Sequence, residues 1–374
     1  MKARIIAFYL PQFHPIPEND LWWGKGFTEW TNVAKAKKLF PGHYQPRIPA
    51  DLGFYDLRLP EAREAQAELA REHGIAGFCY WHYWFGGRQI LQRPFEEVLA
   101  SGRPTLPFCL AWANESWSGV WHGAPGRILL QQTYPGPEDD DSHFRSVLPA
   151  FLDDRYLKVD GCPIFVIYRP RQMPHLERFT DRWRELALRA GLKGMLFAGI
   201  SADGRSEGPA CLDGFLPYLP QTERLDLWGF VPPAARITVR DWIVKTRGRF
   251  SRSHDSPDVP SAPPSFWPQT FSYEEFVDSA FSDLRFDDRT IPVVVPNWDN
   301  TPRCGLKGTV LHNATPALFE RHLRQAVHLV SSRAADRQLV FIRSWNEWAE
   351  GNHMEPDLRF GRGLLSALKA VTEE

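Results

Sequence analysis

The hydrophobic pattern of the chain alternates between short apolar runs and longer amphipathic segments. Short apolar runs bounded by turn residues are typical of strands that are buried on both faces. Such runs occur at residues 4–10, 75–80, 106–112, 163–168, 195–200, 213–218, 291–295 and 339–342, and the sixth has the weakest pattern. Apolar residues at helical spacing predict helices at residues 59–73, 94–101, 138–152, 175–190, 273–284, 316–332 and 363–372.

This alternation predicts an α/β fold in which parallel strands close into a (β/α)8 TIM barrel with long loops at the strand ends. Neither an internal repeat nor a clear linker divides the chain, so we expect residues 1–374 to form a single domain. A doubly wound open sheet is the alternative, but no G-x-G-x-x-G opens a first helix. Residues 221–268 are rich in Pro, Arg and Ser without a steady period, which predicts a partly mobile insertion or lid.

The composition narrows the class of protein. With 374 residues, 43% of them hydrophobic, the chain is long enough for a sizeable core. A net charge of −1 gives no reason to expect nucleic acid or an anionic membrane as partner, and no window is long enough for a membrane span. The N-terminus does not resemble a signal peptide, and the five cysteines include no C-x-x-C pair. These features predict a cytoplasmic protein with reduced thiols.

The last apolar run leads into the stretch S-W-N-E-W-A-E-G. Its two carboxylates, Glu347 and Glu350, are three residues apart and lie among Trp345, Asn346 and Trp348. A surface loop rarely contains so much tryptophan, and a core rarely contains so much acid. A solvated helix face with tryptophans packed at its rim is the plainer interpretation. We favour a sugar site, in which aromatic faces stack on the ring and a carboxylate pair acts on the glycosidic bond.

The ends of the other predicted strands carry similar residues. In a barrel the active site lies at the carboxyl ends of the strands, and polar and aromatic residues follow most of them here. We therefore expect Glu347, Glu115, His82 and Asn297 to face one pocket. In chain order, the candidate substrate-binding residues are Tyr9, Gln12, His14, Trp22, Trp30, Tyr80, His82, Tyr83, Trp84, Trp112, Asn114, Glu115, Trp117, Asn297, Trp298, Asp299, Trp345, Asn346 and Trp348.

The proposed chemistry sets a condition on the local structure. Glycosyl transfer with retention needs two carboxyl groups about 5–5.5 Å apart. Residues three apart on an extended strand point to opposite faces, whereas in a helical turn they approach to about 5–6 Å. Glu347 and Glu350 must therefore lie on a turn, to which Gly351 gives backbone freedom. One of the two must also stay protonated near neutral pH, with a pKa well above the ordinary value of about 4.3.

Other chemistries have weaker support. His14, His82 and His353 could bind a metal, but no pair has the spacing of an H-E-x-x-H motif, so we expect no metal site. The glycine pairs are better explained as turns than as phosphate-binding loops, and no G-x-S-x-G elbow occurs. We expect no cofactor.

Several long motifs resemble those of one protein family. They are F-Y-L-P-Q-F-H-P at residues 8–15, W-W-G-K-G-F-T-E-W-T-N at 22–32, G-F-C-Y-W-H-Y-W-F at 77–85, A-W-A-N-E-S-W at 111–117 and S-W-N-E-W-A-E-G at 344–351. The chain resembles the WbsX family over nearly its whole length and is least typical at residues 221–268. Members of this family are described as glycosyltransferases of O-antigen and capsule clusters, and also as glycoside hydrolase family 99-like.

The resemblance implies a fold and a mechanism. Family 99 enzymes are (β/α)8 retaining endo-α-mannosidases that need no metal and are thought to form no covalent enzyme intermediate. One carboxylate deprotonates the substrate 2-hydroxyl, which attacks the anomeric carbon to give a 1,2-anhydro sugar. By resemblance, Glu347 takes this role, Glu350 acts as acid and base, and Glu115 matches a further sugar-binding glutamate. The preference for mannose does not carry over.

Two functions remain open. A retaining glycoside hydrolase acting on a bacterial polysaccharide is favoured by the glutamate pair and by the missing nucleotide-binding signature. A glycosyltransferase of O-antigen or capsular polysaccharide biosynthesis is favoured by the missing signal peptide. The acidic run at residues 139–141 follows no strand directly and is better explained as a solvated helix N-terminus than as a metal-binding D-x-D. A non-catalytic carbohydrate-binding module fits less well, and in each case the partner is an oligo- or polysaccharide.

Overall fold

A computed structural model gives the fold and describes residues 3–118, 128–201, 209–218, 220, 225, 267–282 and 286–374. The expected insertion at residues 221–268 lies outside these residues except at isolated positions, so its mobility stays a prediction. None of the helices in the described ranges is long and apolar enough to cross a membrane.

The centre of the molecule is a parallel sheet whose strand order is β11-β10-β9-β5-β2-β1-β16-β13. A parallel bridge between Phe215 and Thr290 joins its two edges, where Ile291 N donates to Phe215 O at 2.7 Å. The sheet is therefore a nearly closed barrel, as the sequence predicts. Its strands are β1 (Arg4–Tyr9), β2 (Ile75–His82), β5 (Phe108–Trp112), β9 (Cys162–Ile167), β10 (Leu196–Ser201), β11 (Gly214–Pro217), β13 (Val293–Val294) and β16 (Leu339–Ile342).

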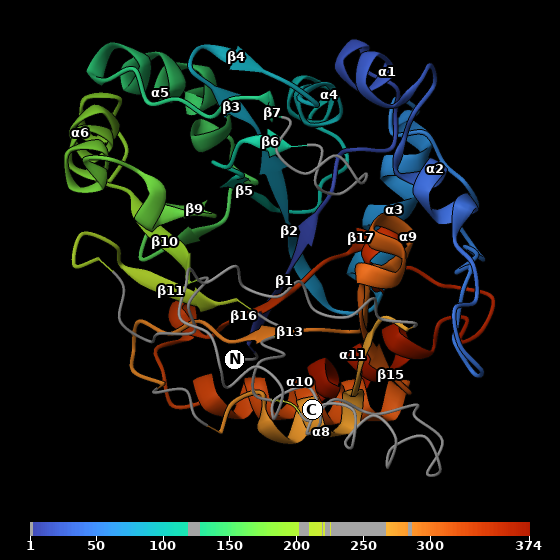
Figure 1. The fold of residues 1–374 in the computed structure, drawn as a ribbon. Coiled ribbons are helices and arrows are strands. Elements are labelled where there is room, and N and C mark those ends of the chain that lie inside the picture. Colours follow the sequence, from blue (N-terminus) through green and yellow to red (C-terminus); the bar gives the residue numbers. More distant parts are fainter. Residues whose placement is uncertain are drawn as a thin grey trace, which may run out of the picture.

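Helices surround the barrel (Figure 1) and lie where the amphipathic pattern predicts them. The helix expected over residues 273–284 is shorter and ends at Ser279. In the described residues between β10 and β11, at 209–213, there is no helix. The helices are α3 (Pro60–Glu72), α4 (Arg93–Ser101), α5 (Pro137–Leu152), α6 (Leu176–Arg189), α8 (Tyr273–Ser279), α10 (Pro316–Val330) and α11 (Gly363–Glu373).

The loops at the strand ends contain short elements that the pattern does not reveal. Two helices, α1 (Pro17–Trp23) and α2 (Glu29–Lys35), lie in the loop after β1, and α9 (Thr301–Cys304) lies between β14 and β15. The remaining elements are β3 (Trp84–Phe85), β4 (Arg88–Gln89), β6 (Trp117–Ser118), β7 (Ile128–Leu130), β8 (Lys158–Val159), η2 (Pro170–Gln172), β12 (Gln269–Ser272), β14 (Trp298–Asp299), η4 (Gly305–Lys307), β15 (Thr309–His312), η5 (Ala335–Arg337), β17 (Asn346–Glu347), η6 (Trp348–Glu350) and β18 (Asn352–His353).

Aromatic side chains form much of the core. Phe8 on β1 stacks on Trp81 of β2, with ring centroids 4.9 Å apart, and contacts Phe341 of β16 at 5.2 Å. Trp345, directly after β16, is fully buried and packs on Phe78. The strands are buried on both faces, which explains why their sequences are continuous apolar runs.

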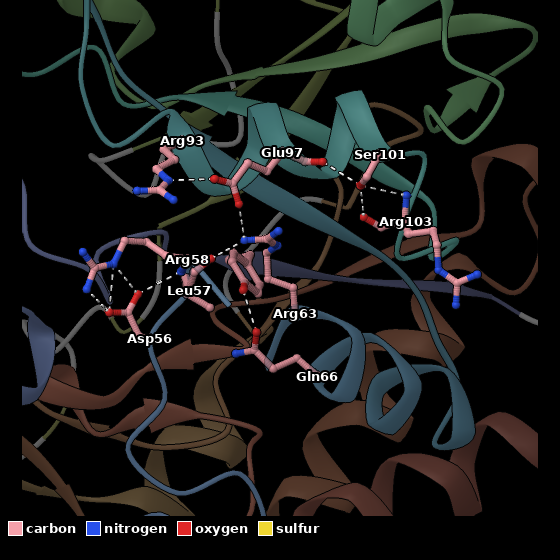
Figure 2. A network of polar contacts seen from close by, with 10 residues as sticks. Asp56, Leu57, Arg58, Arg63, Gln66, Arg93, Glu97, Ser101 and Arg103 are labelled. Atoms are coloured by element: carbon pink, nitrogen blue, oxygen red, sulfur yellow. Dashed lines mark hydrogen bonds and ion pairs between the residues drawn. The ribbon is translucent and has the colours of Figure 1, made fainter. Parts of the chain in front are cut away.

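A polar network holds the outer helices against the first strand. Figure 2 shows Arg63 of α3, whose Nη1 donates to Leu57 O at 2.5 Å and lies 2.8 Å from Glu97 Oε2 on α4. On the same helix, Gln66 Oε1 accepts a hydrogen bond of 2.7 Å from Tyr9 Oη on β1. These contacts fix α3 and α4 relative to the carboxyl end of the barrel.

Candidate active site

The stretch after β16 forms the turn that the catalytic hypothesis requires. Glu347 ends β17, and Trp348, Ala349 and Glu350 form the single 3-10 turn η6. Gly351 follows in the left-handed region with φ +57°, and a Cβ on it would lie 2.8 Å from the Cβ of a neighbouring aspartate. Only glycine fits this position without displacing its neighbours.

One guanidinium joins the two candidate carboxylates. Arg303 Nη1 donates to Glu350 Oε1 at 2.6 Å and to Glu347 Oε1 at 3.2 Å. Arg303 Nη2 donates to Glu29 Oε1 at 2.6 Å. Arg303 comes from α9, which lies beside β17 in Figure 1 and contacts η6, and Glu29 begins α2. Because the two candidate carboxylates share one nitrogen, they lie close together, as a retaining mechanism needs.

The electrostatics of this cluster separate the two carboxylates. Burial, followed by the negative charge of Glu347, raises the pKa of Glu350 to about 7, although Arg303 opposes the shift. Burial also raises the pKa of Glu29, against the effect of the same guanidinium. A carboxyl group with a pKa near neutrality can give and take a proton during a reaction. Glu350 is therefore suited to acid and base catalysis.

A cavity opens over the carboxylates at the carboxyl ends of the strands. Glu347 and Glu350 line it together with the predicted residues Gln12, Tyr83 and Glu115, and with Trp117. An ion pair of 2.8 Å to Arg169 Nε holds Glu115 Oε2. Aromatic walls with a few converging polar groups are typical of a small-molecule site and suit a sugar ring. Further lining residues that the sequence did not single out as binding residues include Trp23, Glu29, Asn32, Trp81, Tyr168, Tyr218, Arg303 and Arg343.

Strand alternation explains why half of the predicted aromatic motif does not line the cavity. Trp81 and Tyr83 line it, whereas His82 between them turns away, and its Nε2 lies 2.8 Å from His143 Nε2. Successive side chains of a strand point to opposite faces. Trp84 likewise stacks on His143, with ring centroids 4.8 Å apart.

The same alternation holds after β5. Ala113 and Glu115 line the cavity, whereas Trp112 donates to a backbone oxygen through its Nε1 and Asn114 Oδ1 accepts from Arg169 N at 2.7 Å. Of the four residues expected to face one pocket, Glu347 and Glu115 line this cavity. His82 and Asn297 do not line this cavity.

Several predicted residues pack behind the turn that carries the two candidate carboxylates. Asn346 accepts from Leu10 N at 2.8 Å and donates to Leu10 O at 3.0 Å, which joins the turn to the end of β1. Trp348 is buried, and Trp30 packs on it with ring centroids 5.5 Å apart. Trp345 is also buried. These residues position the two carboxylates without lining the cavity.

The other predicted residues do not line this cavity. Tyr80 packs on Phe95 and Phe108 in the core, and Tyr9 Oη donates a hydrogen bond to Gln66. His14 is buried. The ring of Trp22 packs edge-on against that of Trp117, with centroids 5.6 Å apart. Asn297 and Asp299 line a second small cavity, in which Asp299 Oδ2 lies 2.8 Å from His43 Nε2, and Trp298 lies under the guanidinium of Arg343.

Glu355 is a buried acid outside the predicted set of site residues. Its carboxylate accepts from Trp348 Nε1 at 2.6 Å, from Gln66 Nε2 at 2.6 Å and from Tyr55 Oη at 2.9 Å. Burial raises its pKa to about 7. The group ties η6 to α3 and to the loop after β1. No spacing in the sequence marks it, since its partners Gln66 and Tyr55 come from distant segments.

Comparisons with known proteins agree with this architecture. The model of the family described as Glycosyltransferase WbsX matches residues 5–368. Proteins described as uncharacterized protein WxcX, from two strains of Xanthomonas campestris pv. campestris, are 37% identical over 376 residues, which cover 99% of this chain and 49% of each relative. The chain thus spans about half the length of these curated relatives.

Solved structures with the same fold are distant in sequence. A glycoside hydrolase-like protein aligns with a TM-score of 0.57 at 14% identity, covering 99% of this chain and 94% of the other. The GH99 endo-alpha-mannosidase from Bacteroides thetaiotaomicron aligns with a TM-score of 0.52 at 16% identity, covering 99% and 96%. At this identity the likeness establishes the barrel fold alone.

Proposed function

The chain belongs to the family described as Glycosyltransferase WbsX, and from this premise we propose that it is a carbohydrate-active enzyme that cleaves a glycosidic bond with retention. The observation that carries the proposal is the pair Glu347 and Glu350 on one turn, joined by Arg303 under a cavity with aromatic walls. We further propose that the substrate is a bacterial oligo- or polysaccharide.

In the proposed first step, Glu347 accepts the proton of the substrate 2-hydroxyl. Oxygen 2 then forms a bond to the anomeric carbon while the bond from this carbon to the leaving oxygen breaks. Glu350 donates its proton to the leaving oxygen, for which a pKa of about 7 is suited. The product of this step is a 1,2-anhydro sugar.

In the second step, Glu350 accepts a proton from water, and the water oxygen attacks the anomeric carbon. The bond from oxygen 2 to this carbon breaks, and Glu347 returns the proton to oxygen 2. Each step inverts the configuration at the anomeric carbon, so the overall result is retention.

A glycosyltransferase is the second candidate, because the family description names that activity. A metal-dependent transferase would bind its nucleotide through a metal ion held by acidic side chains. The acidic run at the start of α5 is the one candidate for such a motif that the sequence analysis considered. There, Asp141 forms two hydrogen bonds of 2.7 Å with Arg182, and Asp139 accepts from Trp84 Nε1. These side chains are engaged in packing α5, which favours the hydrolase.

The experiment that separates the candidates is a digestion screen of bacterial polysaccharides, run beside a sugar-nucleotide hydrolysis control. We expect new reducing ends from at least one polysaccharide, with retained anomeric configuration in the first product seen by NMR. A 2-deoxy version of the cleaved sugar should be inert, because it lacks the internal nucleophile. Release of nucleotide from a sugar nucleotide, with no polysaccharide cleaved, would favour the transferase.

A further inference from the structure

Arg343 is a second arginine in the cavity, and the proposed mechanism does not use it. It directly follows β16, is only 7% exposed, and lines the same cavity as Glu347 and Glu350. Its guanidinium carbon lies 5.3 Å from the ring centroid of Tyr218 and 5.6 Å from that of Trp298. The two rings hold the flat guanidinium in place.

Among the residues that the structure describes, none accepts a hydrogen bond from the Arg343 side chain. A guanidinium carries five N–H donors. Within the described part of the chain, the Arg343 side chain makes no hydrogen bond or ion pair, and its Nε is buried without a partner. Arg303, in contrast, is bound to three carboxylates. A buried polar group without a partner is costly, so the donors of Arg343 are available for a ligand in the cavity.

Arg343 keeps its charge in this position. Burial acts to lower its pKa, but the nearby Tyr218, Glu347 and Glu350 outweigh this effect and raise the pKa. The Tyr218 ring also contacts a second guanidinium, that of Arg169, whose central carbon lies 5.6 Å from the ring centroid. Arg169 is paired with Glu115. Two guanidiniums therefore lie at the ends of β9, β11 and β16, and in the described residues only that of Arg343 is without a carboxylate partner.

We infer that the cavity takes a sugar that carries a carboxylate, a hexuronic acid residue, and that Arg343 binds this carboxylate. The planar fork of a guanidinium matches a carboxylate through two parallel hydrogen bonds. This inference rests on the proposed function, which makes this cavity the sugar-binding site. A binding measurement can test it even if no substrate is cleaved.

The test uses matched methyl glycosides: glucuronide and glucoside, galacturonide and galactoside, mannuronide and mannoside. Dissociation constants are measured by NMR titration for the wild type, Arg343→Met, Arg343→Lys and Arg359→Met. Arg359 is the control, because its guanidinium also packs on two rings, those of Tyr44 and Phe360, outside this cavity. Thermal melts establish that each variant is folded.

We expect at least one uronide to bind the wild type about 10–100-fold more tightly than its neutral partner. This is the gain in affinity that a hydrogen-bonded contact between charged groups typically gives. Arg343→Met should abolish this preference, Arg343→Lys should keep part of it, and Arg359→Met should leave it unchanged. Equal binding of acid and neutral sugars, no binding of any uronide, or a preference that survives Arg343→Met would overturn the inference. A uronide preference in a protein that cleaves no polysaccharide would instead refute the proposed function alone.

Discussion

Arg303→Met removes the cation that three buried carboxylates share. Glu29 is fully buried, and Glu347 and Glu350 are almost so. After the substitution, none of the three retains Arg303's contacts of 2.6–3.2 Å. Removing one partner of a buried ion pair typically costs about 3–5 kcal/mol, because a charge is left buried without compensation. We expect a loss of this size in the free energy of unfolding at pH 8.

The loss should depend on pH. Arg303 lowers the pKa of Glu29 and Glu350, against the effect of burial, so without it the folded-state pKa values rise further. A carboxyl group whose pKa is raised in the folded state contributes stability at low pH, and this contribution is lost as the pH rises from about 4.3 through the folded pKa. The deficit of Arg303→Met should therefore be small at pH 5 and large at pH 8.

Urea denaturation at pH 5 and pH 8 measures both quantities. Arg359→Met is the control, since it removes an exposed arginine and should cost less than about 1 kcal/mol at either pH. Adding Glu29→Gln to Arg303→Met should restore part of the stability, because the double variant no longer buries the Glu29 charge that has lost Arg303 as its partner. A loss below about 1 kcal/mol at pH 8, or equal losses at both pH values, would refute the electrostatic cluster.

Three further outcomes follow from the site. Glu355→Gln should flatten the fall in wild-type stability between about pH 4.3 and 7, because burial raises the pKa of Glu355 to about 7; an unchanged slope in urea denaturation across this range contradicts this. Gly351→Ala should cost about 1–3 kcal/mol, since the added Cβ is too close to Asp299 at a positive φ, and an unchanged melting temperature would count against it. On any cleaved polysaccharide, kcat/KM should fall above about pH 7 as Glu350 loses its proton, whereas a flat profile to pH 9 would exclude this acid.

The barrel is predictable from the sequence because its strands are buried on both faces. Runs such as residues 339–342 have no polar position, and the helices between the runs have a clear amphipathic period. The sequence pattern does not reveal the short helices α1, α2 and α9. Each has at most seven residues, too few to show a helical period, and tertiary contacts such as that of Arg303 with Glu29 hold them in place.

The carboxylate pair could be identified because Glu347 and Glu350 are close in sequence and follow a strand. Arg303 and Glu29 could not, since they are 274 positions apart and meet only when the barrel closes. The aromatic motif after β2 indicated the right strand end but not which side chains enter the cavity. Knowing that Trp81 and Tyr83 point inward, and His82 away, requires the register of the strand.

The most direct test of the central claim compares Glu350→Gln and Glu347→Gln on a cleaved polysaccharide and on an aryl glycoside of the same sugar. Glu350→Gln should lose about 10²–10⁴-fold in rate on the polysaccharide and recover part of the first step on the aryl glycoside, whose leaving group needs no proton. Glu347→Gln should be impaired on both substrates, because the 2-hydroxyl loses its base. Full activity of both variants on the polysaccharide would contradict the assignment of this pair as the catalytic site.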